Sequence, residues 1–187
     1  MTISIFRRIK RNSFSNTIPV THTAETVKEK ERGIIMVLTE KEIAAIRDLQ
    51  TQEKTCIEKY GKYAGQAKDP VLKNLFTELQ KKECRHYDSL GQVLNGTVPD
   101  CNCNDSDGRD YNPTATYTGM ADTEEKKADC FLATDCIGTE KLVSSEYNSD
   151  VFVFGDAGVR RLLADIQVEE QNHAEMLYKY KTVNAMS

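Results

Sequence analysis

Residues 83–86 read ECRH, and residues 170–173 read EQNH. In an α-helix, residues three apart lie one turn from each other on one face, so each motif would place a Glu beside a His. A further Glu stands 30 residues upstream of each motif, at Glu53 and Glu140. A single Glu-x-x-His is a weak signal, but four Glu placements at fixed offsets are a strong one.

The two motifs belong to an internal repeat with an offset of 87 residues. The matching residues extend well beyond the motifs and have chemically varied side chains. They are Asp48 and Asp135, Glu53 and Glu140, Lys54 and Lys141, Tyr60 and Tyr147, Leu75 and Leu162, Gln80 and Gln167, Glu83 and Glu170, His86 and His173, and Leu90 and Leu177. We therefore expect two similar halves, each of which donates one Glu and one Glu-x-x-His motif.

Apolar residues at spacings of three and four predict four amphipathic helices. Their expected N-termini are Thr39, Asp69, Asp122 or Thr123, and Asp156. The first carries a capping box, with Glu42 three residues after Thr39, and the second has Pro70 at its first helical position. A long polar loop over about 96–121 separates the second helix from the third. Short, long and short connections predict an all-α four-helix bundle with one long crossover between the second and third helices.

Composition excludes several classes of protein. The 187 residues are enough for one domain with a full core. A net charge of −4 and a pI near 5.5 argue against a nucleic-acid binder, which needs a positive field. The mean hydropathy is −0.55, and no apolar run approaches the roughly 18 residues of a membrane span. We expect no nucleic-acid partner and no membrane segment.

The N-terminal residues 1–38 differ in composition from the rest of the chain. They contain a basic start and a Ser/Thr/Asn-rich stretch without helical periodicity, so we expect a disordered extension. A start of translation at Met36, with residues 1–35 untranslated, is a second interpretation of the same stretch. The ordered domain is predicted to cover residues 39–187.

The apolar stripes of the four predicted helices contain six residues that bind metals in other proteins. They are Glu53, Glu83, His86, Glu140, Glu170 and His173. A bundle would bury all four carboxylates together, which is costly unless their charge is compensated. Two divalent cations would neutralise four carboxylates, and the mixed oxygen and nitrogen donors suit iron or manganese. A remnant site held by shared protons is the alternative.

Neighbouring residues on the same faces each allow more than one interpretation. Tyr60 and Tyr147 lie two turns after Glu53 and Glu140, where they could fill the core, hydrogen-bond a ligand or relay electrons. Gln80 and Gln167 stand one turn before the Glu-x-x-His motifs and could support the ligands or lie at the surface edge.

Six cysteines are present, and no secretory signal precedes them. Four lie in helical patterns, where we expect reduced, packed side chains: Cys56, Cys84, Cys130 and Cys136. Cys101 and Cys103 fall in the polar loop, and their role, in redox chemistry or cross-linking or neither, is left open by the sequence.

The six-residue inventory resembles that of ferritin-like di-iron and di-manganese carboxylate proteins. The chain also resembles the Coat F family of spore coat proteins over about residues 37–187. That likeness runs through TEKEIAAIRDLQTQEKTCIEKYGKYAGQAKDPVLKNLF at 39–76, KKECRHYDSL at 81–90 and VEEQNHAEML at 168–177. The Coat F resemblance implies a ferritin-like fold and a place in the spore coat, beside other coat proteins, after synthesis in the cytoplasm. Family membership alone does not imply catalysis.

Rubrerythrin-type peroxidases share this kind of ligand set, but the two Cys-x-x-Cys pairs of their rubredoxin module do not occur here. Two functions therefore remain open. The first is a spore coat component with a di-iron or di-manganese site. The second is a soluble di-metal oxidoreductase that reduces peroxide or oxygen. Pairing of two-helix faces would also allow a homodimer.

Overall fold

The computed structural model describes residues 36–100, 106–119 and 121–186. These residues belong to one compact unit, Ile35–Ser187, and fold into helices without any strand in the described ranges. In chain order the elements are α2 (Glu40–Gln66), α3 (Pro70–Leu94), α4 (Asp107–Asp110), α5 (Glu124–Asp150), the 3₁₀ turn η1 (Val151–Val153) and α6 (Ala157–Val183). The predicted all-α class is confirmed. Residues 1–35, Cys101 and Cys103 lie outside the described residues, so the predictions for them stay predictions.

Each long helix begins where the sequence places a cap. At the start of α2, Thr39 and Glu42 form the capping box: the Glu42 carboxylate accepts from the Thr39 backbone N–H at 2.8 Å. Asp69 caps α3 and Asp156 caps α6 through their carboxylates. For α5, Thr123 is the N-cap, which settles the choice between residues 122 and 123.

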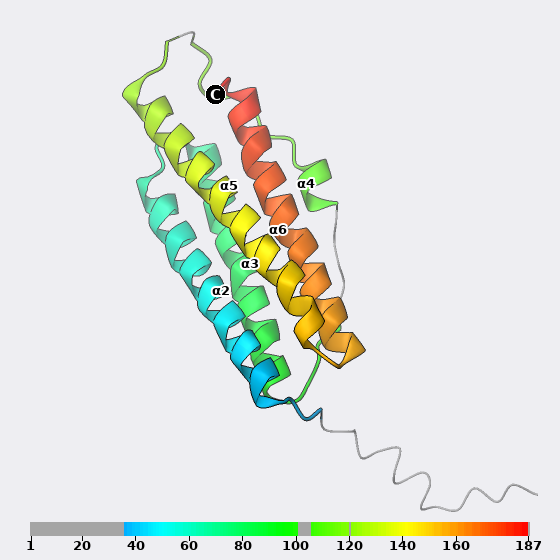
Figure 1. Cartoon of the computed structure of the whole chain (residues 1–187). Helices are drawn as coiled ribbons and strands as arrows, with labels where there is room; N and C mark the ends of the chain where they lie inside the picture. The colour runs from blue at the N-terminus through cyan, green and yellow to red at the C-terminus, as the bar shows by residue number, and fades with distance from the viewer. Residues whose placement is uncertain (1–35, 101–105, 120, 187) are drawn as a thin grey trace, which may run out of the picture. The chain divides into compact units, whose positions relative to one another are not determined.

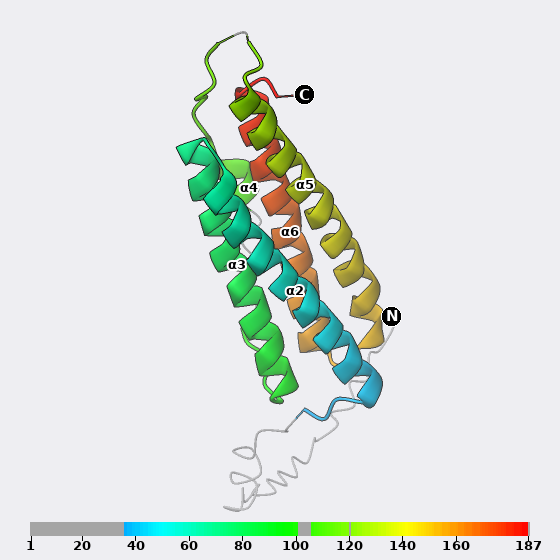
Figure 2. The ribbon, with the colours of Figure 1, turned by 90° about the vertical axis from the view of Figure 1, so that its left-hand side faces the viewer.

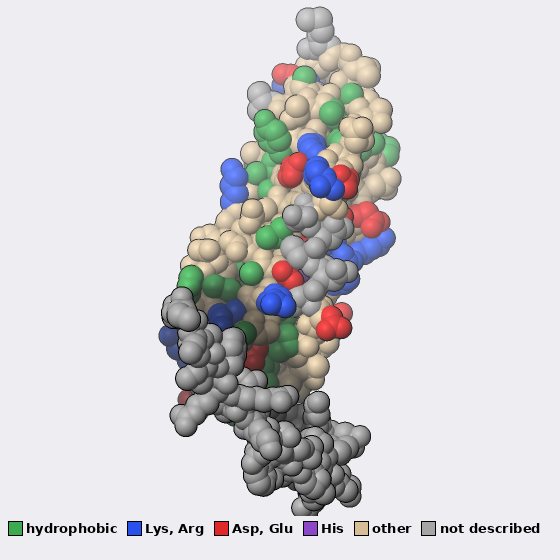
Figure 3. All heavy atoms as spheres, turned by 90° about the vertical axis from the view of Figure 1, so that its right-hand side faces the viewer, with side chains coloured by type: hydrophobic (Ala, Val, Ile, Leu, Met, Phe, Trp, Pro, Cys, Tyr) green, Lys and Arg blue, Asp and Glu red, His purple; other side chains and the backbone are tan. Residues whose placement is uncertain are grey.

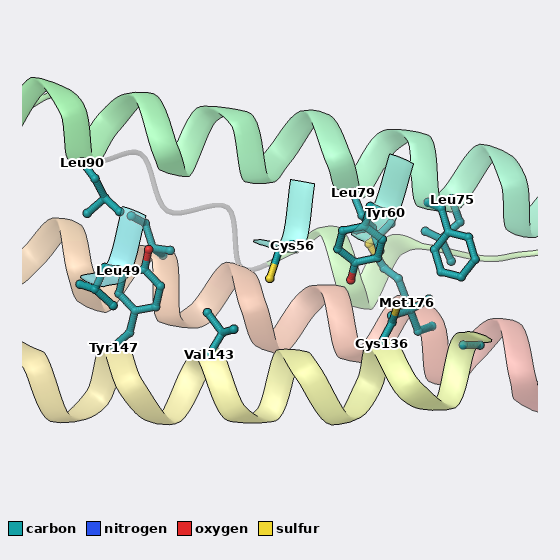
Figure 4. Packing of buried hydrophobic residues seen from close by; sticks show 14 of the residues in the cluster. Leu49, Cys56, Tyr60, Leu75, Leu79, Leu90, Cys136, Val143, Tyr147 and Met176 are labelled. Carbon is teal, nitrogen blue, oxygen red and sulfur yellow. The ribbon is translucent and has the colours of Figure 1, made fainter. Parts of the chain in front are cut away.

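The four long helices lie side by side in a bundle (Figures 1 and 2). Most helix contacts join α2 to α3 and α5 to α6, so the bundle consists of two antiparallel pairs. Figure 4 shows apolar side chains that interdigitate along the axis, among them Leu49, Leu79 and Val143. Polar candidate ligands occupy the middle of the helices, between these apolar layers.

The turns of the two pairs are held in the same way. The turn between α5 and α6 donates its Gly155 N–H to Glu42 of α2, at 2.9 Å. The turn between α2 and α3 donates its Lys68 N–H to Asp129 of α5, also at 2.9 Å. The two donors, Lys68 and Gly155, are 87 residues apart, and so are the two acceptors, Glu42 and Asp129. The sequence repeat is therefore also a repeat of three-dimensional positions.

The crossover from α3 to α5 contains one short helix, α4, that the sequence did not predict. Gly108 of α4 donates its N–H to Asn172 of α6 at 3.0 Å, and Lys179 bonds the Gly108 carbonyl at 2.6 Å. A Cβ at position 108 would lie 2.7 Å from the Asn172 side chain and 3.1 Å from its Cα. Glycine is favoured here because a side chain at this position would have to push the Asn172 and Glu175 side chains aside and would crowd the α6 backbone.

None of the described helices is long and apolar enough to cross a membrane. Acidic and basic side chains lie close to one another on the face shown in Figure 3. That mixture agrees with the small net charge of the chain.

Candidate metal centre

All six candidate ligands point into the bundle from the middle of the four long helices. Helices α2 and α5 each contribute one Glu, while α3 and α6 each contribute a Glu and a His. All six side chains are buried, and none has an exposed fraction above 4%. They are Glu53, Glu83, His86, Glu140, Glu170 and His173. The structure thus brings together the whole set that the sequence predicted.

The Nδ1 atom of the first histidine, His86, faces three carboxylates. His86 Nδ1 lies 3.0 Å from Glu170 Oε1, 3.3 Å from Glu83 Oε2 and 3.7 Å from Glu53 Oε2. One donor atom from each of these four residues lies within 4.8 Å of the others. A single imidazole N–H cannot serve three carboxylate oxygens, but one cation bound among them could.

The Nδ1 atom of the second histidine, His173, has matching surroundings. His173 Nδ1 lies 3.0 Å from Glu83 Oε1, 3.4 Å from Glu170 Oε2 and 3.7 Å from Glu140 Oε2. These residues form a second cluster of four with donor atoms within 4.8 Å. The rings of His86 and His173 stack at 5.7 Å between centroids, so the two clusters are neighbours.

Glu83 and Glu170 belong to both clusters. Each offers one oxygen toward His86 and the other toward His173. This is the arrangement expected of two bridging carboxylates between two cations. Glu53 and Glu140 would then be terminal ligands, one for each cation.

Hydrogen bonding provides a test of whether the residues present fit bound cations. Among the described residues, the buried side-chain nitrogen and oxygen atoms that lack a hydrogen-bond partner all belong to the six candidate ligands. Buried polar atoms are normally satisfied, and such a group costs about 1–3 kcal/mol when it is not. The unsatisfied atoms face one another, so cations would satisfy them, and the residues fit a metal centre.

Two tyrosines cross from one helix pair to the ligand of the other. The Tyr60 hydroxyl of α2 donates to Glu140 of α5, and the Tyr147 hydroxyl of α5 donates to Glu53 of α2. Both rings are buried, and burial raises their pKa well above the ordinary value, so the hydroxyls keep their protons. The tyrosines fill the core and orient a ligand at once, two roles that the sequence left as alternatives.

The glutamines do not contact the ligands in this way. Gln80 donates to the Ile57 carbonyl of the neighbouring helix at 3.0 Å, and Gln167 lies 3.5 Å from Asn148 Oδ1. Their amides therefore tie together the helices within each pair, which favours the surface-edge interpretation.

Glu169 is a site residue that the sequence analysis missed. Its carboxylate lies 2.9 Å from His86 Nε2, the ring nitrogen that faces away from the cluster. A carboxylate in this position fixes the tautomer and orientation of a metal-binding imidazole. The 87-residue offset pairs Glu169 with Lys82, which contacts Asp107 of α4 instead. No spacing rule would have found Glu169, because its partner lies on another helix.

Without a bound cation, protons on the Glu and His side chains reduce the negative charge of the cluster. Burial, followed by repulsion from Glu170, raises the pKa of Glu53 and Glu140 well above the ordinary range. Burial disfavours charged His86 and His173, but the surrounding carboxylates outweigh it and raise the pKa of both rings. Metal binding must therefore displace protons from the cluster.

The four cysteines of the described helices form no disulfide with one another. Cys56 and Cys136 are buried as expected, and burial raises the pKa of both. Cys130 is half-buried, whereas Cys84 is exposed on α3. The expectation of a packed side chain was wrong for Cys84, because position 84 follows the buried Glu83 and faces outward.

Comparison of the chain with protein-family models, curated proteins and solved structures found no match.

Proposed function

We propose that this chain is a spore coat component whose ferritin-like four-helix bundle holds two divalent iron or manganese ions. One observation carries the metal part of the proposal: two clusters of four buried ligands share Glu83 and Glu170 and leave their donor atoms unsatisfied. Carboxylate and imidazole donors suit iron and manganese, although copper and zinc would compete on affinity.

The chain's own residues would hold the centre in a fixed geometry. Glu83 and Glu170 would bridge, His86 and His173 would bind through Nδ1, and Glu53 and Glu140 would complete the set. The buried hydroxyl protons of Tyr60 and Tyr147 fix the two terminal carboxylates from the opposite helix pair. The apolar layers on either side would keep bulk water from the ligands.

The location in the spore coat rests on the resemblance to Coat F proteins over residues 37–187. Its test is direct: an antibody against the chain should detect it in washed coat extracts of spores from its source organism. Recovery only from the cytoplasm of vegetative cells would contradict a coat location. It would leave the metal centre as a separate question.

A second candidate function is reduction of peroxide or oxygen. When bound, two divalent ions supply two electrons, one each, which with two protons reduce one hydrogen peroxide to two waters; an external reductant restores the ions. The observation that favours this function is a surface pocket between α5 and α6 that reaches Glu140 and Glu170. The two candidates are compatible, since a coat protein can also remove peroxide.

The experiment that tests the centre is metal analysis by mass spectrometry. Metal-free protein is supplied anaerobically with iron(II) or manganese(II), desalted and measured beside a Glu83→Ala/His86→Ala variant. We expect about two ions per chain in the natural sequence and their loss in the variant. Folded protein that takes up neither metal would mean a remnant site whose carboxylates are held by shared protons.

A further inference from the structure

A pocket of about 170 Å³ opens at the surface between α5 and α6. Glu140 and Glu170, both buried, line it at its inner end. The remaining lining residues are exposed or half-buried and form its walls: Lys141, Ser144, Gln171 and Ala174. The pocket therefore connects the surface with a terminal and a bridging ligand of the candidate centre.

The other helix pair has bulkier residues at the equivalent positions. With the 87-residue offset, Ile57 of α2 corresponds to Ser144, and Tyr87 of α3 corresponds to Ala174. The offset relates true three-dimensional positions, because it also relates the two turn contacts and the two crossing tyrosines. The ligands and the flanking Lys54 and Lys141 are retained in both halves, while the other three wall positions differ: Ser144, Ala174 and also Gln171, which corresponds to Cys84.

That difference has a physical consequence for access. Ser144 and Ala174 are among the smallest side chains, whereas Ile57 and Tyr87 add a branched aliphatic chain and an aromatic ring. If the wall positions of α5 and α6 carried those larger groups, they would fill the space above Glu140 and Glu170. The small residues leave the space beside Glu140 and Glu170 unfilled.

We propose that the α5–α6 pocket is the route by which metal ions and the substrate reach the centre, and that Ser144 and Ala174 set the size limit. This inference rests on the proposed oxidoreductase function. An enclosed cavity of about 150 Å³ holds one benzene molecule, so a pocket of about 170 Å³ favours molecules of that size or smaller. Hydrogen peroxide and dioxygen belong to that class, and bulky organic hydroperoxides do not.

The first test is the rate of manganese(II) uptake by metal-free protein, followed by rapid desalting and metal analysis. A Ser144→Ile/Ala174→Tyr variant gives these two wall positions of the α5–α6 pocket the larger residues of the α2–α3 pair. We expect uptake to slow by about tenfold, the rate equivalent of ~1.4 kcal/mol, with the final metal content unchanged. Adding Ile57→Ser and Tyr87→Ala should open the other side and restore the rate.

A matched control separates the pocket from added bulk. Ala164→Tyr places the same ring on the exposed face of α6 and should leave the uptake rate unchanged. Folding of each variant is checked by circular dichroism and thermal melting. Ala174→Tyr alone takes the place of the double variant if the latter does not fold.

The second test uses metal-loaded protein and two oxidants of different size. The natural sequence should consume hydrogen peroxide at least about tenfold faster than cumene hydroperoxide, and the Ser144→Ile/Ala174→Tyr variant should lose about tenfold of its hydrogen peroxide rate. If the natural sequence binds two ions but this variant matches it in uptake and in peroxide rate, the pocket is not the route. Natural protein that takes up no metal would overturn the proposed function itself, and the route with it.

Discussion

The two helix pairs supply identical candidate ligands but surround them with different residues. The pair α5–α6 has a pocket beside Ser144 and Ala174, and the pair α2–α3 carries the larger Ile57 and Tyr87 at the equivalent positions. The Nε2 atom of His86 contacts the Glu169 carboxylate. Among the described residues, the Nε2 atom of His173 has no hydrogen-bond partner, although it is also buried. The repeat thus retains the six candidate ligands, whereas the residues that line the pocket and the carboxylate that orients a histidine differ between the halves.

The largest expected effect separates bridging from terminal ligands. Glu83→Ala or Glu170→Ala should reduce the bound metal from about two ions per chain to almost none, because each residue belongs to both clusters. Glu53→Ala and Glu140→Ala should each leave about one ion, since each belongs to one cluster. Metal analysis at matched free manganese(II) measures this.

Glu58→Ala, an exposed position on α2, serves as the control and should keep the full metal content. Equal losses in all four ligand variants would contradict the distinction between shared and terminal carboxylates. A similar loss for Glu53→Ala and Glu140→Ala is required if the two halves are equivalent as binding sites.

The next effect concerns how the two pairs are held together. Most helix contacts lie within the pairs, so metal ions that bind residues of both pairs should add to the stability of the bundle. At a free metal concentration 100 times the dissociation constant of each site, each bound ion adds about 2.7 kcal/mol of stability. For a domain of this size, that corresponds to a rise in melting temperature of roughly 5–10 °C.

Differential scanning calorimetry with manganese(II) and with a chelator measures this rise. The Glu83→Ala/His86→Ala variant should melt at the same temperature in both conditions. A rise of equal size in that variant would show that manganese stabilises the chain elsewhere.

A smaller effect tests the asymmetry between the histidines. Glu169→Ala should weaken metal binding by about tenfold, because it removes the carboxylate that orients His86. Lys82→Ala changes the equivalent position in the other half, which bonds Asp107 rather than a ligand, and should leave affinity unchanged. Competition with a metal-binding dye gives both affinities, and a loss for Lys82→Ala as large as that for Glu169→Ala would argue against a specific role of Glu169.

Local signals in the sequence were sufficient to predict much of this architecture. Thr39, Asp69, Thr123 and Asp156 begin helices because their side chains accept backbone N–H groups within the next turn, an interaction between near neighbours. The clustering of the six buried Glu and His residues was predictable for a related reason: helical spacing determines which residues share a face, and the repeat indicated the partner helices.

Features that depend on contacts between distant elements were not predictable. Glu169 follows from the approach of α6 to α3, and helix α4 follows from the close contact of Gly108 with Asn172. Exposure of Cys84 depends on which side of α3 meets its neighbours. Periodicity within one segment carries none of this information, because it does not specify how helices rotate against one another.

The smallest effect concerns the turns that the two halves hold in the same manner. Glu42 accepts from the backbone of Thr39 and of Gly155, and these bonds lower its pKa below the usual value of 4.5. Glu42→Gln removes the charge and one acceptor, so the free energy of unfolding should fall by about 1 kcal/mol at pH 7. Asp129→Asn makes the equivalent change at the other turn.

The acid dependence of Glu42→Gln has a defined sign. Because the folded-state pKa of Glu42 lies below the unfolded one, its contribution is complete above about pH 4.5 and is lost as the pH falls through the folded value. Urea titrations at pH 7, 4.5 and 3 should therefore show the difference between natural protein and Glu42→Gln shrinking toward zero. Glu40→Gln, in the same helical turn but exposed, removes a charge without these bonds and serves as the control. A difference that stays constant down to pH 3 would mean that the Glu42 charge does not hold the α5–α6 turn, and that the two turns are equivalent in geometry alone.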